Sequence, residues 1–391
     1  MRVTRKNSGT SGSGRGRTAR GGVTQGHVQS AGAKIGTGAH GITYNVGTDT
    51  AEPTLHSLIT ATPIKSVTLY TANGTKVEYA DPAIIAEFVA YIAAQRKTLA
   101  KVFKEAADMK KEFESEIAAN KRIIDIYGDK AAEYLTMAAV PPFRGHNPVA
   151  AAVASADGKK TTYAIFITKC LNNYEMDLDR FTVDILESVI VLQNLSFLHN
   201  DIKLDNVVLC NGRYKLIDWG QCGHLMDIQK TAGTLLGTNP IRWYILGHPH
   251  MIAKSMISFR TTFRYMTFSK TKIFRDNMAR INSEYNEVVA KPHTKAGLLS
   301  KYAYSLDIFM LGMAMLHAVY KYDLNYAKYG PLIEKFTSLT NPVRNAFEAL
   351  RIAETDLFPR ARGSSTPRGK RSGQSTPRGK RSGQATPRAA H

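Results

Sequence analysis

Long uncharged apolar segments are missing from this sequence. The best candidate, residues 308–320, is shorter than the roughly 18 residues that a membrane-spanning helix needs. We therefore expect no membrane partner, and we expect residues 308–320 to form a buried core helix. The N-terminus also lacks the apolar region of a secretory signal, which favours an intracellular protein.

Cysteine is scarce as well. The three cysteines, Cys170, Cys210 and Cys222, have no zinc-ligand spacing and do not form an even set for disulfide pairing. We predict that all three are reduced thiols in an intracellular protein.

Acidic residues are absent from both ends of the chain. Residues 1–34 contain seven Lys or Arg and residues 359–391 contain nine, so the two ends carry 16 of the 20 excess positive charges. The N-terminal end consists mostly of Gly, Ser, Thr and Arg. In the C-terminal end, residues 365–374 (STPRGKRSGQ) recur identically at 375–384, and a partial copy follows. Such segments cannot bury a core, so both are predicted to be disordered basic tails.

Two functions fit these basic tails better than simple solubilisation. Their Lys and Arg residues could bind nucleic-acid phosphates without sequence specificity, or they could act as nuclear-import signals. The repeats contain no aromatic residue, which excludes stacking on bases. Thr366, Thr376 and Thr386 each precede a proline, and their phosphorylation would reduce the local positive charge.

Between the tails, strand patterns come first and helix patterns follow. Strands are predicted within 35–46 (two, around a Gly-rich turn), at 67–70 and 76–79 (a hairpin), and at 98–103, 134–140 and 163–168. Helices are predicted from 82 onward, at 104–124 and at 181–198. This order predicts an α+β chain of two lobes, a β-rich small lobe at 35–171 and a mainly helical large lobe at 172–358.

The clearest chemical signal lies in residues 199–220. His199, Asp201, Lys203 and Asn206 form the pattern H-x-D-x-K-x-x-N, and Asp218 follows twelve residues later in Asp-Trp-Gly. Phosphoryl transfer needs a base, a cation and a metal platform around a loose transition state. Asp201 is the candidate base, Lys203 the candidate cation, and Asn206 and Asp218 offer the oxygen ligands that Mg²⁺ prefers.

From about residue 35 to about residue 353, the chain resembles the eukaryotic-type protein kinase superfamily. The resemblance implies a two-lobed kinase fold, ATP and Mg²⁺ as cofactors, and transfer of the γ-phosphate to a protein. Lys203 after the catalytic Asp resembles the serine/threonine branch. Gly36, Gly38 and Gly41 resemble the Gly-rich loop that covers the phosphates.

The family also implies a strand lysine paired with a helix glutamate. Lys101 in 98–103 is similar to the family's lysine strand, and Glu116 is the preferred partner over Glu114. Lys65 with Glu87 is the less favoured alternative pair. Because 59 residues separate Gly41 from Lys101, we expect an insertion on the small lobe at about 47–96, of unassigned function.

Several positions depart from the family pattern. Asn200 replaces an Arg that usually reads an activation-loop phosphate, so we predict activity without that phosphorylation. Trp219 replaces the usual Phe, and a large apolar side chain is kept. No A-P-E sequence closes the activation segment, although Pro240 or Pro249 could mark the region.

Two further segments resemble the family in the large lobe. Gly237-Thr238 resembles the loop whose Thr bonds the catalytic Asp and Lys. Asp307, in Tyr-Ser-Leu-Asp-Ile-Phe-Met-Leu-Gly, resembles the Asp that anchors the catalytic-loop backbone, a structural role.

Two alternatives stay open beside a Ser/Thr protein kinase. One is a catalytically silent kinase-fold scaffold that binds through its tails, although scaffolds usually lose at least one of the four catalytic-loop and metal residues. The other is a kinase-fold enzyme for a small molecule, which the missing A-P-E signature keeps open. The divergent motifs resemble kinases of large DNA viruses, which implies a host cell, its nucleus or a virion as the location, and we expect a monomer.

Overall fold

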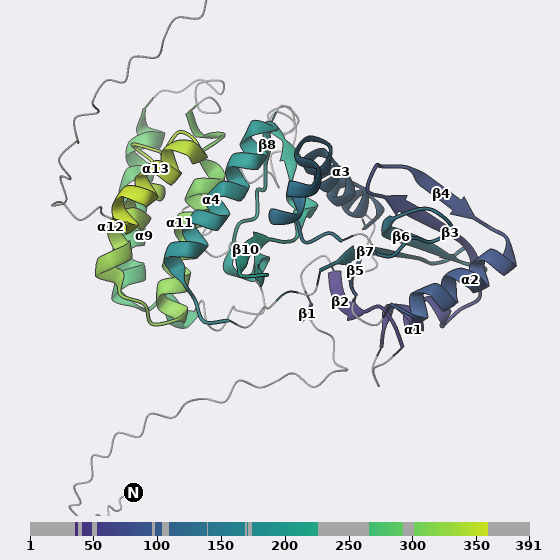
Figure 1. Cartoon of the computed structure of the whole chain (residues 1–391). Coiled ribbons are helices and arrows are strands. Elements are labelled where there is room, and N and C mark those ends of the chain that lie inside the picture. Colours follow the sequence, from purple (N-terminus) through teal and green to yellow (C-terminus); the bar gives the residue numbers. More distant parts are fainter. Residues whose placement is uncertain are drawn as a thin grey trace, which may run out of the picture.

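The computed structural model describes residues 36–37, 41–48, 53–95, 98–103, 109–138, 140–168, 170, 174–225, 266–291 and 301–358. Within this part the predicted α+β class is confirmed. Figure 1 shows a sheet at one end of the molecule and a group of helices at the other. Both predicted tails, and Gly38, Gly237-Thr238, Pro240 and Pro249, lie outside the described residues.

Seven strands of the described chain form one antiparallel sheet, in the order β1-β2-β5-β7-β6-β3-β4. The strands are β1 (Gly36–Thr37), β2 (Gly41–Asn45), β3 (Ile64–Thr71), β4 (Lys76–Tyr79), β5 (Leu99–Phe103), β6 (Pro148–Ser155) and β7 (Thr161–Ile167). The predicted Gly-rich hairpin is confirmed, since β1 pairs with β2. The strand that carries Lys101 lies in the interior of the sheet, between β2 and β7.

The predicted insertion at 47–96 contains α1 (Leu55–Thr60), the confirmed hairpin β3–β4, and α2 (Pro82–Ala93). Because β3 pairs with β6, the insertion extends the main sheet by two strands. Helix α2 begins where the sequence predicts, because the Asp81 carboxylate accepts hydrogen bonds from two backbone N–H groups of the first turn. Pro82 suits the first position of the helix, since proline has no N–H that would lack an acceptor there. Its buried face packs into the core below the sheet through Ile85, Phe88 and Ile92.

The strand predicted at 134–140 is wrong. Among the described residues of this segment, only Met137 forms a bridge, to Ile167. The strand that does form is β6, whose sequence PVAAAVAS has weak strand propensity because alanine is depleted in strands. Its pairing with both β3 and β7 compensates for this weakness.

The described helices beyond the insertion are α3 (Met109–Tyr127), α4 (Leu178–Asn194), α9 (Lys272–Ala290), α11 (Leu306–Lys321), α12 (Tyr326–Phe336) and α13 (Ala346–Leu357). In Figure 1, α3 lies between the sheet and the other helices. Helix α11 is buried from Leu306 to Val319, which confirms the predicted core helix. None of the helices in the described residues is long and apolar enough to cross a membrane.

One short antiparallel strand pair encloses the segment 199–220, which carries the predicted catalytic and metal-binding residues, and a second lies within it. Strand β8 (Phe197–Leu198) pairs with β11 (Gly223–His224), and β9 (Val207–Cys210) pairs with β10 (Arg213–Leu216). The helix predicted at 181–198 therefore ends earlier, at Asn194, where Ser196 has a φ of 58° and reverses the chain into β8. The two strand pairs bring the loop 199–206 beside the loop 217–222, and the Ile217 N–H donates to the Asn206 carbonyl at 2.9 Å.

Candidate active site

The loop after β8 is anchored from the helical side by Asp307. One carboxylate oxygen of Asp307 accepts from the His199 N–H and the other from the Asn200 N–H, both at 2.9 Å. Asp307 is fully buried at the start of α11. Burial raises the pKa of Asp307 to about 6, although the two N–H groups oppose the shift. The anchoring contact predicted for Asp307 is thereby confirmed.

Three of the predicted site residues contact one another in this loop. The Lys203 ammonium lies 2.6 Å from an Asp201 carboxylate oxygen. The Asn206 amide nitrogen donates to the same carboxylate at 2.8 Å and to the Asp201 carbonyl at 2.9 Å. Burial raises the pKa of Asp201, against the opposing effect of Lys203. A positioned carboxylate with raised proton affinity suits a proton acceptor.

A second group of charges joins the sheet, α3 and the Asp218 loop. The Lys101 ammonium lies 2.6 Å from a Glu116 oxygen and 2.8 Å from an Asp218 oxygen. Burial alone would lower the pKa of Lys101, but the two carboxylates outweigh it and raise the pKa, so the side chain stays charged. Lys101 is therefore a fixed positive charge beside the loop that carries Asp218.

The ion pairs show which of the glutamates considered from the sequence pairs with Lys101. Glu114 lies 3.3 Å from Lys76 on the exposed surface of the sheet, and Glu116 is the partner of Lys101 as predicted. Glu87, which the alternative prediction paired with Lys65, lies 2.7 Å from Arg144.

The Gly-rich hairpin is adjacent to this cluster. Gly36 and Gly41 lie on its two strands, and Thr43 of β2 is directly opposite Lys101 of β5. Ligand binding by Gly36, Gly38 and Gly41 remains a prediction.

Backbone conformation explains the residue types at two positions. Asn200 has a φ of 70° and Asp218 a φ of 64°, in the left-handed region. Asn and Asp adopt this region more readily than other non-glycine residues, because their short polar side chains bond locally. Such conformations cluster at active sites, where surrounding contacts maintain them.

His199 and Trp219 form the buried floor of the loops. Their rings meet edge to face with centroids 5.2 Å apart, and the Trp219 indole N–H donates to the Leu216 carbonyl at 3.2 Å. Burial lowers the pKa of His199 to about 4, so the ring is neutral at pH 7. The sequence pattern marked His199 but did not reveal this supporting role.

The oxygen donors of Asn206 and Asp218 suit Mg²⁺. The described residues contain no group of three or more His, Cys, Asp or Glu side chains that could hold a metal ion. A Mg²⁺ ion at Asn206 and Asp218 would therefore depend on phosphate oxygens and waters, which is how Mg²⁺ is usually bound beside nucleotides.

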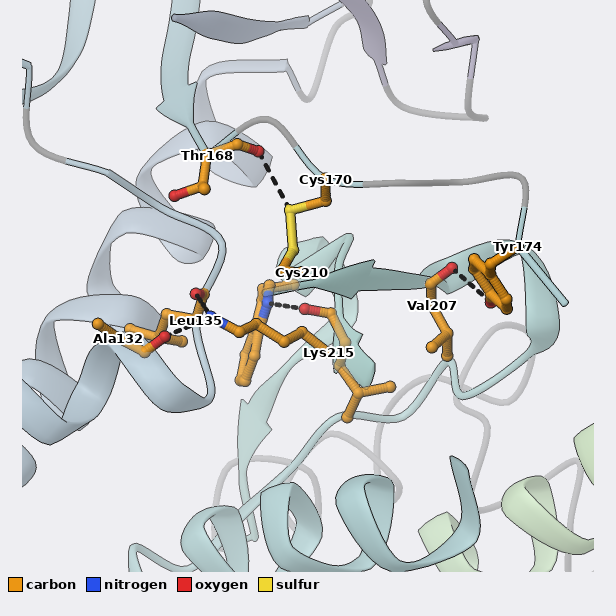
Figure 2. The surroundings of a disulfide bond; sticks show 10 residues. Ala132, Leu135, Thr168, Cys170, Tyr174, Val207, Cys210 and Lys215 are labelled. Atoms are coloured by element: carbon orange, nitrogen blue, oxygen red, sulfur yellow. Dashed lines mark hydrogen bonds between the residues drawn. A yellow bond between two sulfur atoms is a disulfide. The ribbon is translucent and has the colours of Figure 1, made fainter. Parts of the chain in front are cut away.

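The prediction of three reduced thiols is wrong. Cys170 and Cys210 form a disulfide with their Cα atoms 4.6 Å apart, and Cys222 is a free, buried thiol. Figure 2 shows this bond between the segment after β7 and the end of β9. Spacing alone could not reveal it, because the pairing of two cysteines 40 residues apart depends on tertiary structure.

Lys215, next to this disulfide, also escaped the sequence analysis. It is buried on β10, and its ammonium donates to the carbonyls of Ala132 and Leu135 (Figure 2). Burial lowers the pKa of Lys215. The contact links the hairpin β9–β10 to the segment that follows α3.

No protein-family model matches the sequence, and no curated protein is significantly similar to it.

Proposed function

We propose that this protein is a serine/threonine protein kinase that transfers the γ-phosphate of ATP to protein hydroxyls. The observation that carries the proposal is the juxtaposition of two polar groups: Asp201, Lys203 and Asn206 on one loop, and Lys101, Glu116 and Asp218 beside it. Together they offer a base, two cations and hard oxygen ligands, which are the parts that phosphoryl transfer requires.

The order of elements supports the same proposal. A Gly-rich hairpin, a lysine strand and a glutamate helix are followed by a helical part that begins with α4. The kinase resemblance implies this order, and the hairpin β3–β4 adds to the far edge of the sheet without separating β2 from β5.

Each residue has a role that its surroundings permit. Asp201 accepts the proton of the acceptor hydroxyl and orients the attacking oxygen. Lys203 neutralises charge on the transferred group, and Lys101, held by Glu116, binds the ATP phosphates. Asn206 and Asp218 would hold Mg²⁺, which supplies charge neutralisation between the phosphates.

An assay with ATP, Mg²⁺ and acidic or basic protein substrates tests the proposal. We expect incorporation of phosphate on Ser or Thr, and we expect Asp201→Asn to lower it by about 100-fold or more, as loss of a general base does. Asp205→Asn is the matched control, because Asp205 is an exposed carboxylate in the same loop, 199–206.

The other outcomes discriminate between the alternatives. ATP binding without any phosphate transfer would indicate the silent scaffold. ADP release that depends on added small molecules, with no labelled protein, would indicate a small-molecule kinase. Either result would overturn the proposal.

A further inference from the structure

The disulfide joins two segments that lead directly to the candidate active site. Cys170 follows β7, and β7 pairs with β5 so that Ile165 is opposite Lys101. Cys210 ends β9, which begins immediately after Asn206. Strand β10, the other half of this hairpin, leads into Asp218. The bond therefore connects the sheet that carries Lys101 to the hairpin with Asn206 and Asp218 at its two ends.

The two sulfur atoms differ in accessibility. Cys170 is partly exposed, whereas only 1% of Cys210 is exposed. A soluble thiolate would therefore attack at Cys170, the more exposed of the two residues, and Cys210 is the leaving thiol. Cys222 does not compete in this exchange, because burial raises the pKa of its thiol well above the ordinary value.

We propose that Cys170 and Cys210 form a reversible redox-modification site that controls nucleotide binding. Its effect on nucleotide binding rests on the proposed function. A dithiol reductant attacks the sulfur of Cys170, and Cys210 leaves as a thiolate that takes up a proton. The second thiol of the reductant then attacks the reductant's other sulfur atom, which is bonded to Cys170 in the mixed disulfide. Cys170 leaves as a thiolate that also takes up a proton. The reductant becomes a cyclic disulfide, and the protein gains two electrons and two protons.

The oxidised protein is the form with higher nucleotide affinity. With the bond in place, Lys101 lies within 2.8 Å of Asp218, so the phosphate-binding cation and a metal ligand are already together. Reduction removes the disulfide cross-link between the segment after β7 and the hairpin β9–β10, the only disulfide within the described residues. The contacts of Lys215 with Ala132 and Leu135 persist, so the reduced site is loosened but still folded. The reduced protein no longer holds Lys101 and Asp218 in the arrangement that binds the nucleotide, so its affinity for the nucleotide falls.

The test compares the full chain before and after treatment with dithiothreitol. Alkylation of the unfolded protein followed by mass spectrometry should count one reactive thiol before treatment and three after it. Titration with Mg²⁺-ATP should then give an affinity at least about fivefold weaker for the reduced form, the low end of typical coupling between sites. The double variant Cys170→Ser/Cys210→Ser should bind like the reduced form and ignore dithiothreitol. The control Cys222→Ala should respond like the unmodified chain.

Three free thiols that persist after treatment with diamide would overturn the proposal, as would equal affinities in the two redox forms. If neither form binds ATP, the proposed function fails, and hydrogen exchange decides the redox site separately. Faster amide exchange in β7 and β9 after reduction supports it, and unchanged exchange rejects it.

Discussion

Lys101 lies between two carboxylates in a largely buried position, so it neutralises charge inside the folded protein. Without it, the nearby Glu116 and Asp218 carboxylates would repel each other in a largely buried position. Lys101→Met should therefore lower the free energy of unfolding by about 3 kcal/mol. It should also abolish measurable ATP binding, since the phosphates lose their cation.

The matched control is Lys76→Met, which removes an exposed Lys–Glu pair from the same sheet. Such surface pairs contribute about 0–1 kcal/mol, so this variant should unfold near the wild-type urea midpoint. Equal destabilisation by both substitutions would contradict the argument, and urea titration at pH 7 measures it.

His199 makes a second prediction at the scale of one residue. In the folded protein its pKa is about 4, whereas the unfolded side chain titrates near 6.5. Between pH 6.5 and pH 4 the unfolded state therefore binds more protons at His199 than the folded state does. The free energy of unfolding consequently decreases as the pH falls through this range. The full effect is about 3 kcal/mol.

His199→Phe keeps an aromatic ring against Trp219 but cannot titrate. Its urea midpoint should therefore decline less between pH 7 and pH 4.5 than that of the unmodified chain. Asp307, with a pKa of about 6, has the opposite effect, because its protonation favours the folded state as the pH falls. Both proteins contain Asp307, so its effect cancels when their urea midpoints are compared. The same pH slope in both proteins would exclude a buried neutral His199.

At the scale of elements, the hairpin β9–β10 is a support for α3. Lys215 bonds the two carbonyls just after α3, and Glu116 is on that helix. Lys215→Met should cost about 1–3 kcal/mol, because the carbonyls lose a buried donor. Displacement of α3 should also raise the KM for ATP more than it changes kcat.

Lys130→Met provides the control, since Lys130 is an exposed residue in the same turn. It should leave both stability and KM unchanged. A Lys215 variant that is less stable but has an unaltered KM would limit Lys215 to a purely structural role.

The sequence predicts an element well when its signal is local. Asp81-Pro82 marks the start of α2 through a cap and a proline, and the turn near Gly74 marks the hairpin β3–β4. The proximity of Asp201, Lys203 and Asn206 was predictable because they fall within one short segment. The partner of Lys101 was chosen correctly on position alone.

Features that depend on distant neighbours were not predictable. Strand β6 forms because β3 and β7 flank it, and nothing in its alanine-rich sequence signals this. The Cys170–Cys210 bond and the buried Lys215 arise only after the sheet and the hairpin pack together. The spacing of residues along the sequence does not predict such contacts.

At the scale of the whole molecule, positive charge is concentrated in the two ends. We propose that the C-terminal repeats bind nucleic-acid phosphates non-specifically. Deletion of residues 359–391 removes nine Lys or Arg and should weaken retention on duplex DNA at low salt. Retention should also fall as salt is raised, for the full chain more steeply than for the truncated one. Unchanged elution of the truncated protein would rule this role out.

The strand pair added by the insertion has a consequence for how the protein behaves in concentrated solution. Strand β6 is almost entirely buried, and residues 148–156 contain no charge. As a sheet edge it would present open N–H and C=O groups to any other chain, which is a common route to aggregation. The strand that lies at the edge instead, β4, is short and has the exposed charges of Lys76 and Glu78. A chain that lacks this insertion would therefore be expected to precipitate.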